Sequence, residues 1–271
     1  MATIVITGAT DGLGKAVATE LSRQPDTTLI LHGRRAERLS VVASELAGSI
    51  AAVHTVQADL AELAQVHRLA DEIRALTDHV SVLVNNAGVG GGEPDSPGRE
   101  LTVDGNELRF GVNYLAAFAL TEDLLGLLDA GAPARIVNVA SLGQAPIAFD
   151  DLTLARGYSG QRAYGQSKLA MITAGFRLAE KLDPSRVTVN SLHPGTYMPT
   201  KMVTEWIGYS VDSLETGVNS TLRLIQDPAL AGVSGRFFDR DQEATAHPDA
   251  YRQEVRERLW NISEELVARA S

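Results

Sequence analysis

The chain has 271 residues, a formal net charge of −10 and a sequence pI of about 5.1. Its acidic balance disfavours general binding to nucleic acid or to anionic membranes, and its mean hydropathy of −0.03 is ordinary for a globular protein. The absence of cysteine excludes disulfides, thiolate catalysis and cysteine-ligated metals. Because the first residues lack a basic leader and no apolar run reaches the roughly 18 residues of a spanning helix, we expect a cytoplasmic protein without a membrane anchor.

Short β-branched segments alternate with longer amphipathic segments along the chain. The predicted strands are Thr3–Thr7, Thr28–His32, Ala52–Gln57, Val80–Asn85, Arg135–Ser141, Val187–His193 and Gly235–Phe238. Most of them are apolar nearly throughout, which is typical of parallel strands covered on both faces. The predicted helices are Leu13–Ser22, Ala36–Ala47, Leu63–Thr77, Gly105–Ala130, Gln161–Lys181 and Ser213–Gln226.

Repeated β-α-β units predict an α/β fold, with helices on both faces of a Rossmann-type, doubly wound parallel sheet. No linker, repeat or charge block divides the chain, so we expect one domain over residues 1–271. Val89–Arg99 and Gly195–Gly208 are predicted loops, and the second is the candidate substrate loop. The tail Pro248–Ser271 has the pattern of an exposed amphipathic helix.

A glycine-rich turn lies between the first predicted strand and the first predicted helix. Its glycines allow a tight turn, a close approach of backbone to a pyrophosphate, and close packing of helix on strand. The helix N-terminus adds unpaired N–H groups for the phosphates, although such turns also occur as plain connectors. The candidate cofactor-binding residues here are Gly8, Thr10, Asp11, Gly12, Leu13 and Gly14.

The end of the second strand indicates which dinucleotide binds. A site that prefers NAD needs a carboxylate there for the ribose 2′-hydroxyl, but this chain has Arg34 and Arg35. Two guanidiniums suit a 2′-phosphate, so we predict NADP(H); an exposed basic turn that caps the next helix is the alternative. After the third strand, Asp59 and Leu60 are candidates for the adenine, and Asp59 is equally suited to cap the following helix.

Tyr164 and Lys168 are four residues apart in a predicted helix and therefore share one face. An adjacent ammonium is expected to lower the pKa of the phenol, which suits a group that exchanges a proton with a hydroxyl or carbonyl. Ser141 ends the fifth strand, where its hydroxyl can orient a substrate carbonyl, and Asn113 can hold a water that connects Lys168 to solvent. Tyr158 competes for the same role, but it precedes the helix and has Arg162 four residues on.

Taken together, these motifs resemble the short-chain dehydrogenase/reductase superfamily. The similarity rests on Thr7–Gly14, Asn85–Gly88, Asn113, Ser141, Tyr164–Lys168 and Pro194-Gly195, in that order. It implies a sheet of about seven strands and a catalytic set of Asn113, Ser141, Tyr164 and Lys168, with Lys168 also holding the nicotinamide ribose. It further implies cofactor contacts from Asn86, Ala87, Gly88, Pro194, Gly195 and Thr196.

Three segments resemble a narrower branch that holds retinol dehydrogenases, WW-domain oxidoreductases and light-dependent protochlorophyllide reductases. They are Leu101–Asn113, Ala148–Leu152 and Leu259–Val267, together with the 23-residue step from Ser141 to Tyr164. The missing membrane anchor speaks against a membrane-embedded retinoid enzyme. The missing cysteine speaks against a protochlorophyllide reductase.

The expected substrate is a small hydrophobic alcohol, ketone or aldehyde. The substrate loop supplies the apolar residues Tyr197, Met198, Met202, Trp206 and Ile207, although each also suits ordinary packing of a surface helix. No metal is expected, because the histidines lack ligand spacing. A nucleotide-sensing Rossmann regulator without turnover is the alternative function. Two long apolar helical stretches, Phe110–Leu128 and Ala163–Leu182, predict a homodimer or homotetramer.

Overall fold

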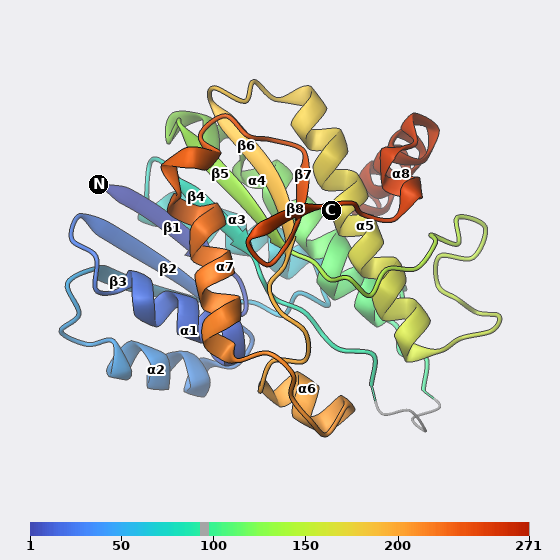
Figure 1. Cartoon of the computed structure of the whole chain (residues 1–271), viewed down its shortest axis with the longest axis horizontal. Coiled ribbons are helices and arrows are strands. Elements are labelled where there is room, and N and C mark those ends of the chain that lie inside the picture. Colours follow the sequence, from blue (N-terminus) through green and yellow to red (C-terminus); the bar gives the residue numbers. More distant parts are fainter. Residues whose placement is uncertain (93–97, 271) are drawn as a thin grey trace.

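The computed structural model describes residues 1–92 and 98–270, apart from the side chains of Met202, Glu205 and Trp206. Its described strands form one sheet in the order β3-β2-β1-β4-β5-β6-β7-β8 (Figure 1). They are β1 (Ala2–Ile6), β2 (Thr27–Gly33), β3 (Ala52–Gln57), β4 (Val82–Asn85), β5 (Ala134–Val139), β6 (Val187–His193), β7 (Arg236–Asp239) and β8 (Gln242–Ala244). All neighbours pair in parallel except β7 and β8, so the predicted Rossmann-type sheet is confirmed.

The sheet has one strand more than the expected seven. The additional strand, β8, returns antiparallel to β7 through a tight turn in which Arg240 adopts a φ of 55°. Its three residues, Gln242–Ala244, are too few and too polar to give a strand pattern in the sequence. β8 therefore depends on pairing with β7 rather than on local propensity.

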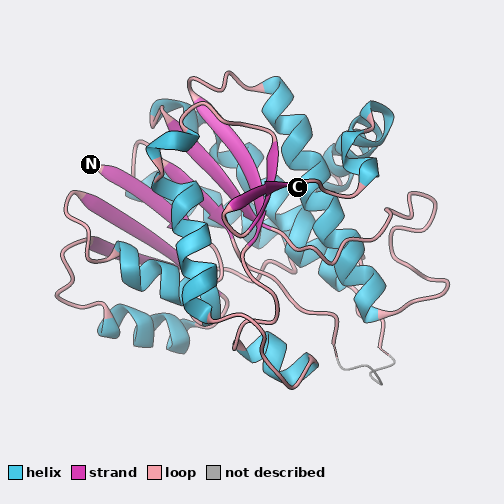
Figure 2. Cartoon of the chain, in the orientation of Figure 1, coloured by secondary structure: helices cyan, strands magenta, loops and turns pink. Residues whose placement is uncertain are grey.

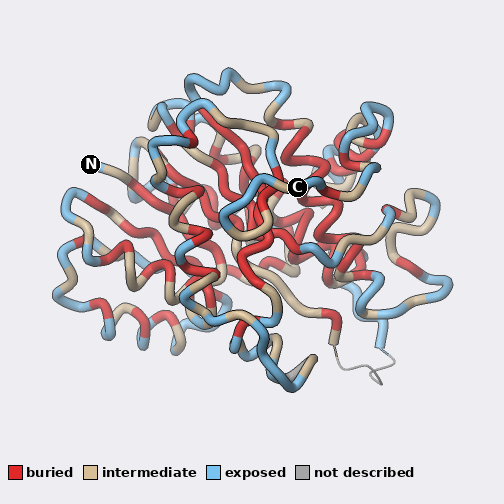
Figure 3. Tube along the Cα trace, viewed as in Figure 1, coloured by how far each residue is buried: buried red, intermediate tan, exposed pale blue. Residues whose placement is uncertain are grey.

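Helices cover both faces of the sheet in two layers (Figure 2). They are α1 (Gly12–Leu21), α2 (Ala36–Glu45), α3 (Leu63–Leu76), α4 (Ala116–Ala130), α5 (Gly160–Lys181), α6 (Lys201–Trp206), α7 (Leu214–Gln226) and α8 (Gln253–Ala268). Apolar side chains of α1, α2 and α7 share one core with the sheet, and those of α3, α4, α5 and α8 share the core on the opposite face. The buried strands run between these cores (Figure 3).

The helix predicted at Gly105–Ala130 begins later, as a π-helical turn, η1 (Phe110–Leu115), that continues into α4. Gly105 has a φ of 81° in the turn before it, and the Glu107 carboxylate accepts a hydrogen bond from the Phe110 N–H, which fixes the start. Within the described chain, Phe110–Ala130 is also the single helical segment long and apolar enough to cross a membrane. Because 61% of its most apolar window is buried, core packing accounts for this composition.

The tail is partly buried rather than exposed as expected. After a short 3₁₀ turn, η3 (Pro248–Tyr251), helix α8 packs on α5 (Figure 1). Val255, Leu259 and Trp260 recur at helical spacing and are buried, and the Trp260 ring meets the Phe118 ring edge-on at 4.9 Å. This apolar stripe was visible in the sequence, but the surface that receives it, on α4 and α5, was not.

Candidate active site

One large cavity, with a volume of about 870 Å³, opens at the carboxyl ends of β1, β4, β5 and β6. This edge is where open α/β sheets bind ligands. Of the predicted site residues, the cavity wall contains Gly8, Thr10, Asp11, Gly12, Leu13, Arg34, Asp59, Leu60, Asn86, Ala87, Gly88, Ser141, Tyr164, Lys168, Pro194, Gly195 and Thr196. Gly14, Arg35 and Asn113 lie outside the wall. With these three exceptions, the predicted site residues therefore gather around one cavity.

The glycine-rich turn has the geometry of a phosphate-binding turn. Gly8 and Gly12 adopt φ values of 66° and 52°, which side chains rarely tolerate. At Gly14 a Cβ atom would lie 2.4 Å from the Gly8 carbonyl oxygen, so this glycine permits close helix–strand packing. The Asp11 side chain accepts from the Gly12 N–H at 2.7 Å and caps α1. Room for backbone against a ligand, together with a large adjoining cavity, fits a bound dinucleotide.

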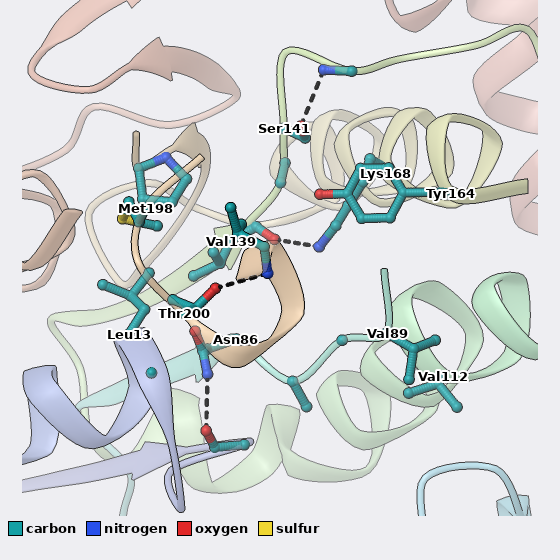
Figure 4. A pocket seen from close by; sticks show the side chains of 18 of the residues that line it. Leu13, Asn86, Val89, Val112, Val139, Ser141, Tyr164, Lys168, Met198 and Thr200 are labelled. Carbon is teal, nitrogen blue, oxygen red and sulfur yellow. Dashed lines mark hydrogen bonds between the residues drawn. The ribbon is translucent and has the colours of Figure 1, made fainter. Parts of the chain in front are cut away.

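Thr7 and Asn86 join the turn to the end of β4. The Thr7 hydroxyl accepts hydrogen bonds from the N–H groups of Asn86 and Ala87, both at 3.0 Å. In return, the Asn86 amide donates to the Thr7 and Gly8 carbonyl oxygens at 2.8 and 3.1 Å, and Figure 4 shows Asn86 in the cavity wall. These bonds fix the floor of the cavity between β1 and β4.

His32 is a cavity residue that the sequence analysis did not single out. Its Nδ1 accepts from the Gly8 N–H at 3.3 Å, and its Nε2 lies 3.0 Å from the Ala58 carbonyl oxygen. This pair of contacts requires a neutral ring with the proton on Nε2. Burial lowers the pKa of His32 to about 4, which keeps that tautomer at neutral pH. Its position at the end of β2, directly beside the glycine-rich turn, was the available signal.

The two arginines after β2 separate in the structure. Arg34 lines the cavity, whereas Arg35 sits at the N-terminus of α2 without a side-chain capping bond. The predicted fork of two guanidiniums is therefore reduced to Arg34. A neighbouring arginine, Arg38, pairs with Asp11 across the turn at 3.4 Å.

Asp59 lines the cavity but does not cap α3. Its carboxylate accepts from the Ala61 N–H at 3.0 Å, within the turn that follows β3. Helix α3 begins later, at Leu63, whose N–H donates to Asp104 at 2.9 Å. The capping interpretation of Asp59 is wrong because a turn separates the strand from the helix.

Tyr164 and Lys168 lie side by side on α5 and face the cavity (Figure 4). The Lys168 Nζ is 5.7 Å from the centre of the Tyr164 ring and donates to the Val139 carbonyl oxygen at 2.7 Å. The Ser141 hydroxyl, two residues beyond the end of β5, hydrogen-bonds to Tyr164 and accepts from the Gly143 N–H at 3.0 Å. The predicted phenol, ammonium and hydroxyl groups thus lie together in one part of the cavity wall.

The expected decrease in the pKa of Tyr164 is not found. Burial raises it above its usual value of 10, and this outweighs the opposite effect of the bond to Ser141. Lys168 does not offset the burial, because its ammonium is directed to Val139 and burial lowers its own pKa to about 8. Tyr164 is therefore a protonated phenol at neutral pH, a state suited to donate a proton.

Asn113 lies behind the cavity wall, in the π-helical turn η1. Its amide donates to the Val89 carbonyl oxygen at 3.1 Å and to Ser167 at 3.0 Å, and its oxygen accepts from the Val89 N–H at 2.7 Å. A Cβ atom at Gly88 would lie 3.2 Å from the Asn113 oxygen and 3.7 Å from the Lys168 Nζ. Both hydrogens of the Asn113 amide are engaged in these bonds. The predicted water can therefore bind only to the side-chain oxygen or to the backbone carbonyl oxygen of Asn113.

The segment after β6 closes another side of the cavity. Pro194, Gly195 and Thr196 line it, and the Thr196 N–H donates to Asp212 at 2.6 Å. Arg240, in the turn before β8, pairs with the same carboxylate at 2.6 Å, so the β7–β8 hairpin holds this segment in place.

The predicted substrate loop contains a short helix, α6, in its second half. Thr200 caps this helix by accepting a hydrogen bond from the Val203 N–H. Tyr197 and Met198 line the cavity as expected, whereas Ile207 lies outside its wall. The side chains of Met202 and Trp206 lie outside the described part of the structure. Leu108, Val112, Leu142, Gln144, Ala145 and Arg162 also line the cavity and were not predicted. They come from segments that are distant in sequence, so periodicity could not have found them.

No cluster of His, Asp and Glu able to hold a metal ion occurs among the residues that the structure describes. A mostly parallel sheet with a glycine-rich turn after its first strand and a buried phenol in the same cavity matches the arrangement of Rossmann-type oxidoreductases. The family model for short chain dehydrogenases matches residues 2–208, and the chain belongs to this family. Its members are oxidoreductases that interconvert alcohols and carbonyl compounds with a nicotinamide cofactor, and this activity class extends to the chain.

Individual relatives place the chain more closely. Human retinol dehydrogenase 13 is 37% identical over 287 residues, which cover 98% of this chain and 84% of that protein. The crystal structure of an uncharacterized protein from Mycobacterium paratuberculosis has a TM-score of 0.78 at 31% identity and covers 99% of this chain and 94% of its own. The RhlG/NADP active-site complex of Pseudomonas aeruginosa has a TM-score of 0.71 at 25% identity, and the match covers 89% of this chain and 94% of the RhlG chain. The predicted retinol dehydrogenase-like branch is confirmed.

Proposed function

We propose that the chain is an NADP(H)-dependent oxidoreductase that interconverts an apolar alcohol with its ketone or aldehyde, with Tyr164 as the general acid and base. The observation that carries the proposal is that Tyr164, Lys168 and Ser141 line the same cavity as the glycine-rich turn. A dinucleotide on the turn and a carbonyl at Tyr164 would share this cavity. The names of the retinol dehydrogenase relatives support an alcohol or aldehyde with an apolar body.

NADP(H) is favoured over NAD(H) by charge at the adenine end of the cavity. Arg34 follows β2 and lines the cavity, and no carboxylate stands at that point of the sequence. A guanidinium binds a 2′-phosphate through charge-assisted hydrogen bonds, whereas the ribose 2′-hydroxyl of NAD needs an acceptor. The RhlG/NADP complex supports the same choice. When bound, the nicotinamide supplies or accepts the hydride.

Each side chain near Tyr164 has a separate task in this proposal. The Ser141 hydroxyl hydrogen-bonds to the substrate oxygen and holds it beside Tyr164. Tyr164 then donates its proton to that oxygen in reduction, or accepts a proton from the alcohol in oxidation. The Lys168 ammonium would turn from the Val139 carbonyl oxygen to bind the nicotinamide ribose, and in that position it would stabilise the phenolate. Asn113 holds a water from which the proton on Tyr164 is replaced.

The direct test is NADPH oxidation with a panel of carbonyl compounds that includes retinaldehyde and smaller aromatic ketones. We expect turnover of apolar members and a strong preference for NADPH over NADH. NADPH binding without turnover of any member would instead support the alternative, a nucleotide-sensing regulator. The presence of Ser141, Tyr164 and Lys168 in one cavity favours the enzyme.

Assembly and location are also part of the proposal. We propose a cytoplasmic homodimer or homotetramer, although α8 already covers apolar surface of α5 within one chain. Light scattering at micromolar concentration is the measurement. A mass near 28.9 kDa would show a monomer and overturn the proposed assembly.

A further inference from the structure

Four cationic side chains line the cavity within the described chain, and three of them have a task or a partner. They are Arg34, Arg162, Lys168 and Lys201. The proposed function uses Arg34 and Lys168, and Lys201 takes part in an interaction of its own. Arg162 remains without an assignment.

Arg162 has no carboxylate partner among the described residues. Its Nη1 donates to the Gly157 carbonyl oxygen at 3.1 Å and lies 3.5 Å from that of Arg156. These two neutral carbonyls hold the guanidinium in place but leave its charge uncompensated. A guanidinium that lines a cavity without a carboxylate partner is able to bind an anionic group through charge-assisted hydrogen bonds.

The charge distribution of the wall separates Arg162 from the acidic side chains. The only acidic residues among the described lining are Asp11 and Asp59. Asp11 starts α1, which packs on the opposite face of the sheet from α5, and Asp59 follows the edge strand β3, whereas Arg162 lies in the first turn of α5 (Figure 1). An anion at Arg162 therefore meets no acidic lining residue near it.

The cavity that Arg162 lines also has apolar residues in its wall and contains the candidate proton donor. Leu108, Val112, Leu142 and Ala145 line the cavity, and a Cβ atom at Gly165 would touch Ala145 at 3.0 Å. Arg162 and Tyr164 are two residues apart on α5 and therefore project to different sides of the helix, but both residues line the same cavity. A ligand that lies across the start of α5 can thus reach the phenol and the guanidinium within this one cavity.

We infer that the substrate is an apolar carbonyl compound or alcohol that carries a carboxylate or a similar anionic group, and that Arg162 binds this group. The inference rests on the proposed function for the reacting carbonyl. It adds a second recognition point that an uncharged retinoid does not use. Because the contact forms before any chemistry, it affects KM rather than kcat.

The test compares 4-acetylbenzoate with its uncharged methyl ester, which presents the same ketone to Tyr164. Binding of each to the protein with NADP⁺ is measured by calorimetry, since the ketone has no hydride to accept in that complex. We expect the acid to bind roughly fivefold more tightly than the ester, with a difference that shrinks at high salt because Arg162 is exposed. The same ratio is expected in kcat/KM with NADPH.

Three variants identify the group responsible. Arg162→Gln should bring acid and ester within about twofold, and Arg162→Lys should retain part of the preference. Arg156→Gln is the matched control: its side chain is 85% exposed and pairs with Asp151, and its backbone carbonyl remains. Its acid preference should equal that of the parent.

The outcomes separate this inference from the proposed function. Equal binding of acid and ester to the parent, or an unchanged ratio in Arg162→Gln, would overturn the anion site. An unchanged ratio with a lower melting temperature would show that Arg162 only holds the turn at Gly157. Selective binding of the acid without turnover of either ketone would instead count against the proposed function and leave the anion site standing.

Discussion

The Arg109 guanidinium donates a 2.7 Å hydrogen bond to the hydroxyl of Tyr158. Arg109 is itself held by the buried carboxylate of Glu107 at 3.3 Å and by the Gly90 carbonyl oxygen at 2.9 Å. Tyr158 therefore belongs to a structural cluster outside the wall of the large cavity. Tyr164 lies in that wall, beside Ser141 and Lys168. The two tyrosines that compete in the sequence have different surroundings in the structure, and their variants should differ accordingly.

Tyr164→Phe should remove nearly all turnover and leave NADPH binding unchanged. Loss of a positioned general acid reduces rates by a factor of about 10² to 10⁴. Tyr158→Phe is the control: it should keep kcat within about twofold and lower the free energy of unfolding by about 1 kcal/mol, through the lost bond to Arg109. Steady-state kinetics, NADPH fluorescence titration and urea unfolding measure these effects. Substantial activity in Tyr164→Phe would refute the mechanism.

Arg34→Ala should weaken NADPH binding far more than Arg35→Ala does. Only Arg34 lines the cavity, and the loss of a charge-assisted phosphate contact costs about 1.5–3 kcal/mol, or at least tenfold in Kd. NADH binding should change little in either variant, because it lacks the 2′-phosphate. Calorimetric titration of both cofactors is the measurement. Equal effects of the two substitutions on NADPH would contradict the structural distinction between them.

The pH profile of kcat/KM for NADPH should show the deprotonation of Lys168. This ratio reports groups of the free enzyme, in which burial lowers the pKa of Lys168 to about 8. As the pH rises through 8 the ammonium is lost, and with it the charge that binds the cofactor, so kcat/KM should fall. Tyr164 has a pKa raised above 10 and stays protonated over this range. A flat profile up to pH 9.5 would show that the charge on Lys168 is not needed.

His32 should make the protein less stable in acid. Its pKa is about 4 in the folded protein, against 6.5 as the usual value. Between these values the unfolded chain binds the extra proton, so the free energy of unfolding falls as the pH drops from 6.5 towards 4, by up to roughly 3 kcal/mol. His193, also with a pKa of about 4, acts in the same direction.

His32→Gln should therefore reduce the pH dependence by about half. Its amide can still donate to the Ala58 carbonyl oxygen, and the contribution of His193 remains. Urea unfolding at several pH values between 4 and 7 compares the variant with the parent. Identical slopes for the two proteins would assign the acid sensitivity to other groups.

The sequence predicted the parts of this molecule that depend on short-range pattern. β1, α1 and the turn between them follow from an apolar run, three glycines and the capping Asp11. The helical spacing of Tyr164 and Lys168 placed them together in the same way. Contacts that form only on folding were not predictable: the pairing of β8 with β7, the packing of α8 on α5, and the burial that raises rather than lowers the pKa of Tyr164.

The different positions of Arg34 and Arg35 are another feature that could not be predicted from the sequence. Adjacent residues looked equivalent as partners for a phosphate, yet the first ends the turn after β2 at the cavity and the second starts α2. Arg162 is the converse case. In the sequence it stands only as the residue four after Tyr158, and only the structure places it in the cavity wall.

Gly160 should be the glycine of α5 that tolerates substitution least. A Cβ atom there would lie 1.6 Å from the Gly91 carbonyl oxygen, which is backbone and cannot rotate away. Gly160→Ala must displace either that segment or the start of α5, at a cost of about 1–3 kcal/mol in the free energy of unfolding. Because Tyr164 follows one turn later on the same helix, kcat should fall as well.

Gly126 provides the matched control within α4. A Cβ atom there meets no atom within 4 Å, so Gly126→Ala should stabilise the helix by up to about 1 kcal/mol and leave kcat unchanged. Urea unfolding and steady-state kinetics on both variants test the comparison. If Gly160→Ala matched the parent in stability and activity, the contact between α5 and Gly91 would not hold Tyr164 in place, and its position would have to depend on Ser141 and the rest of the helix.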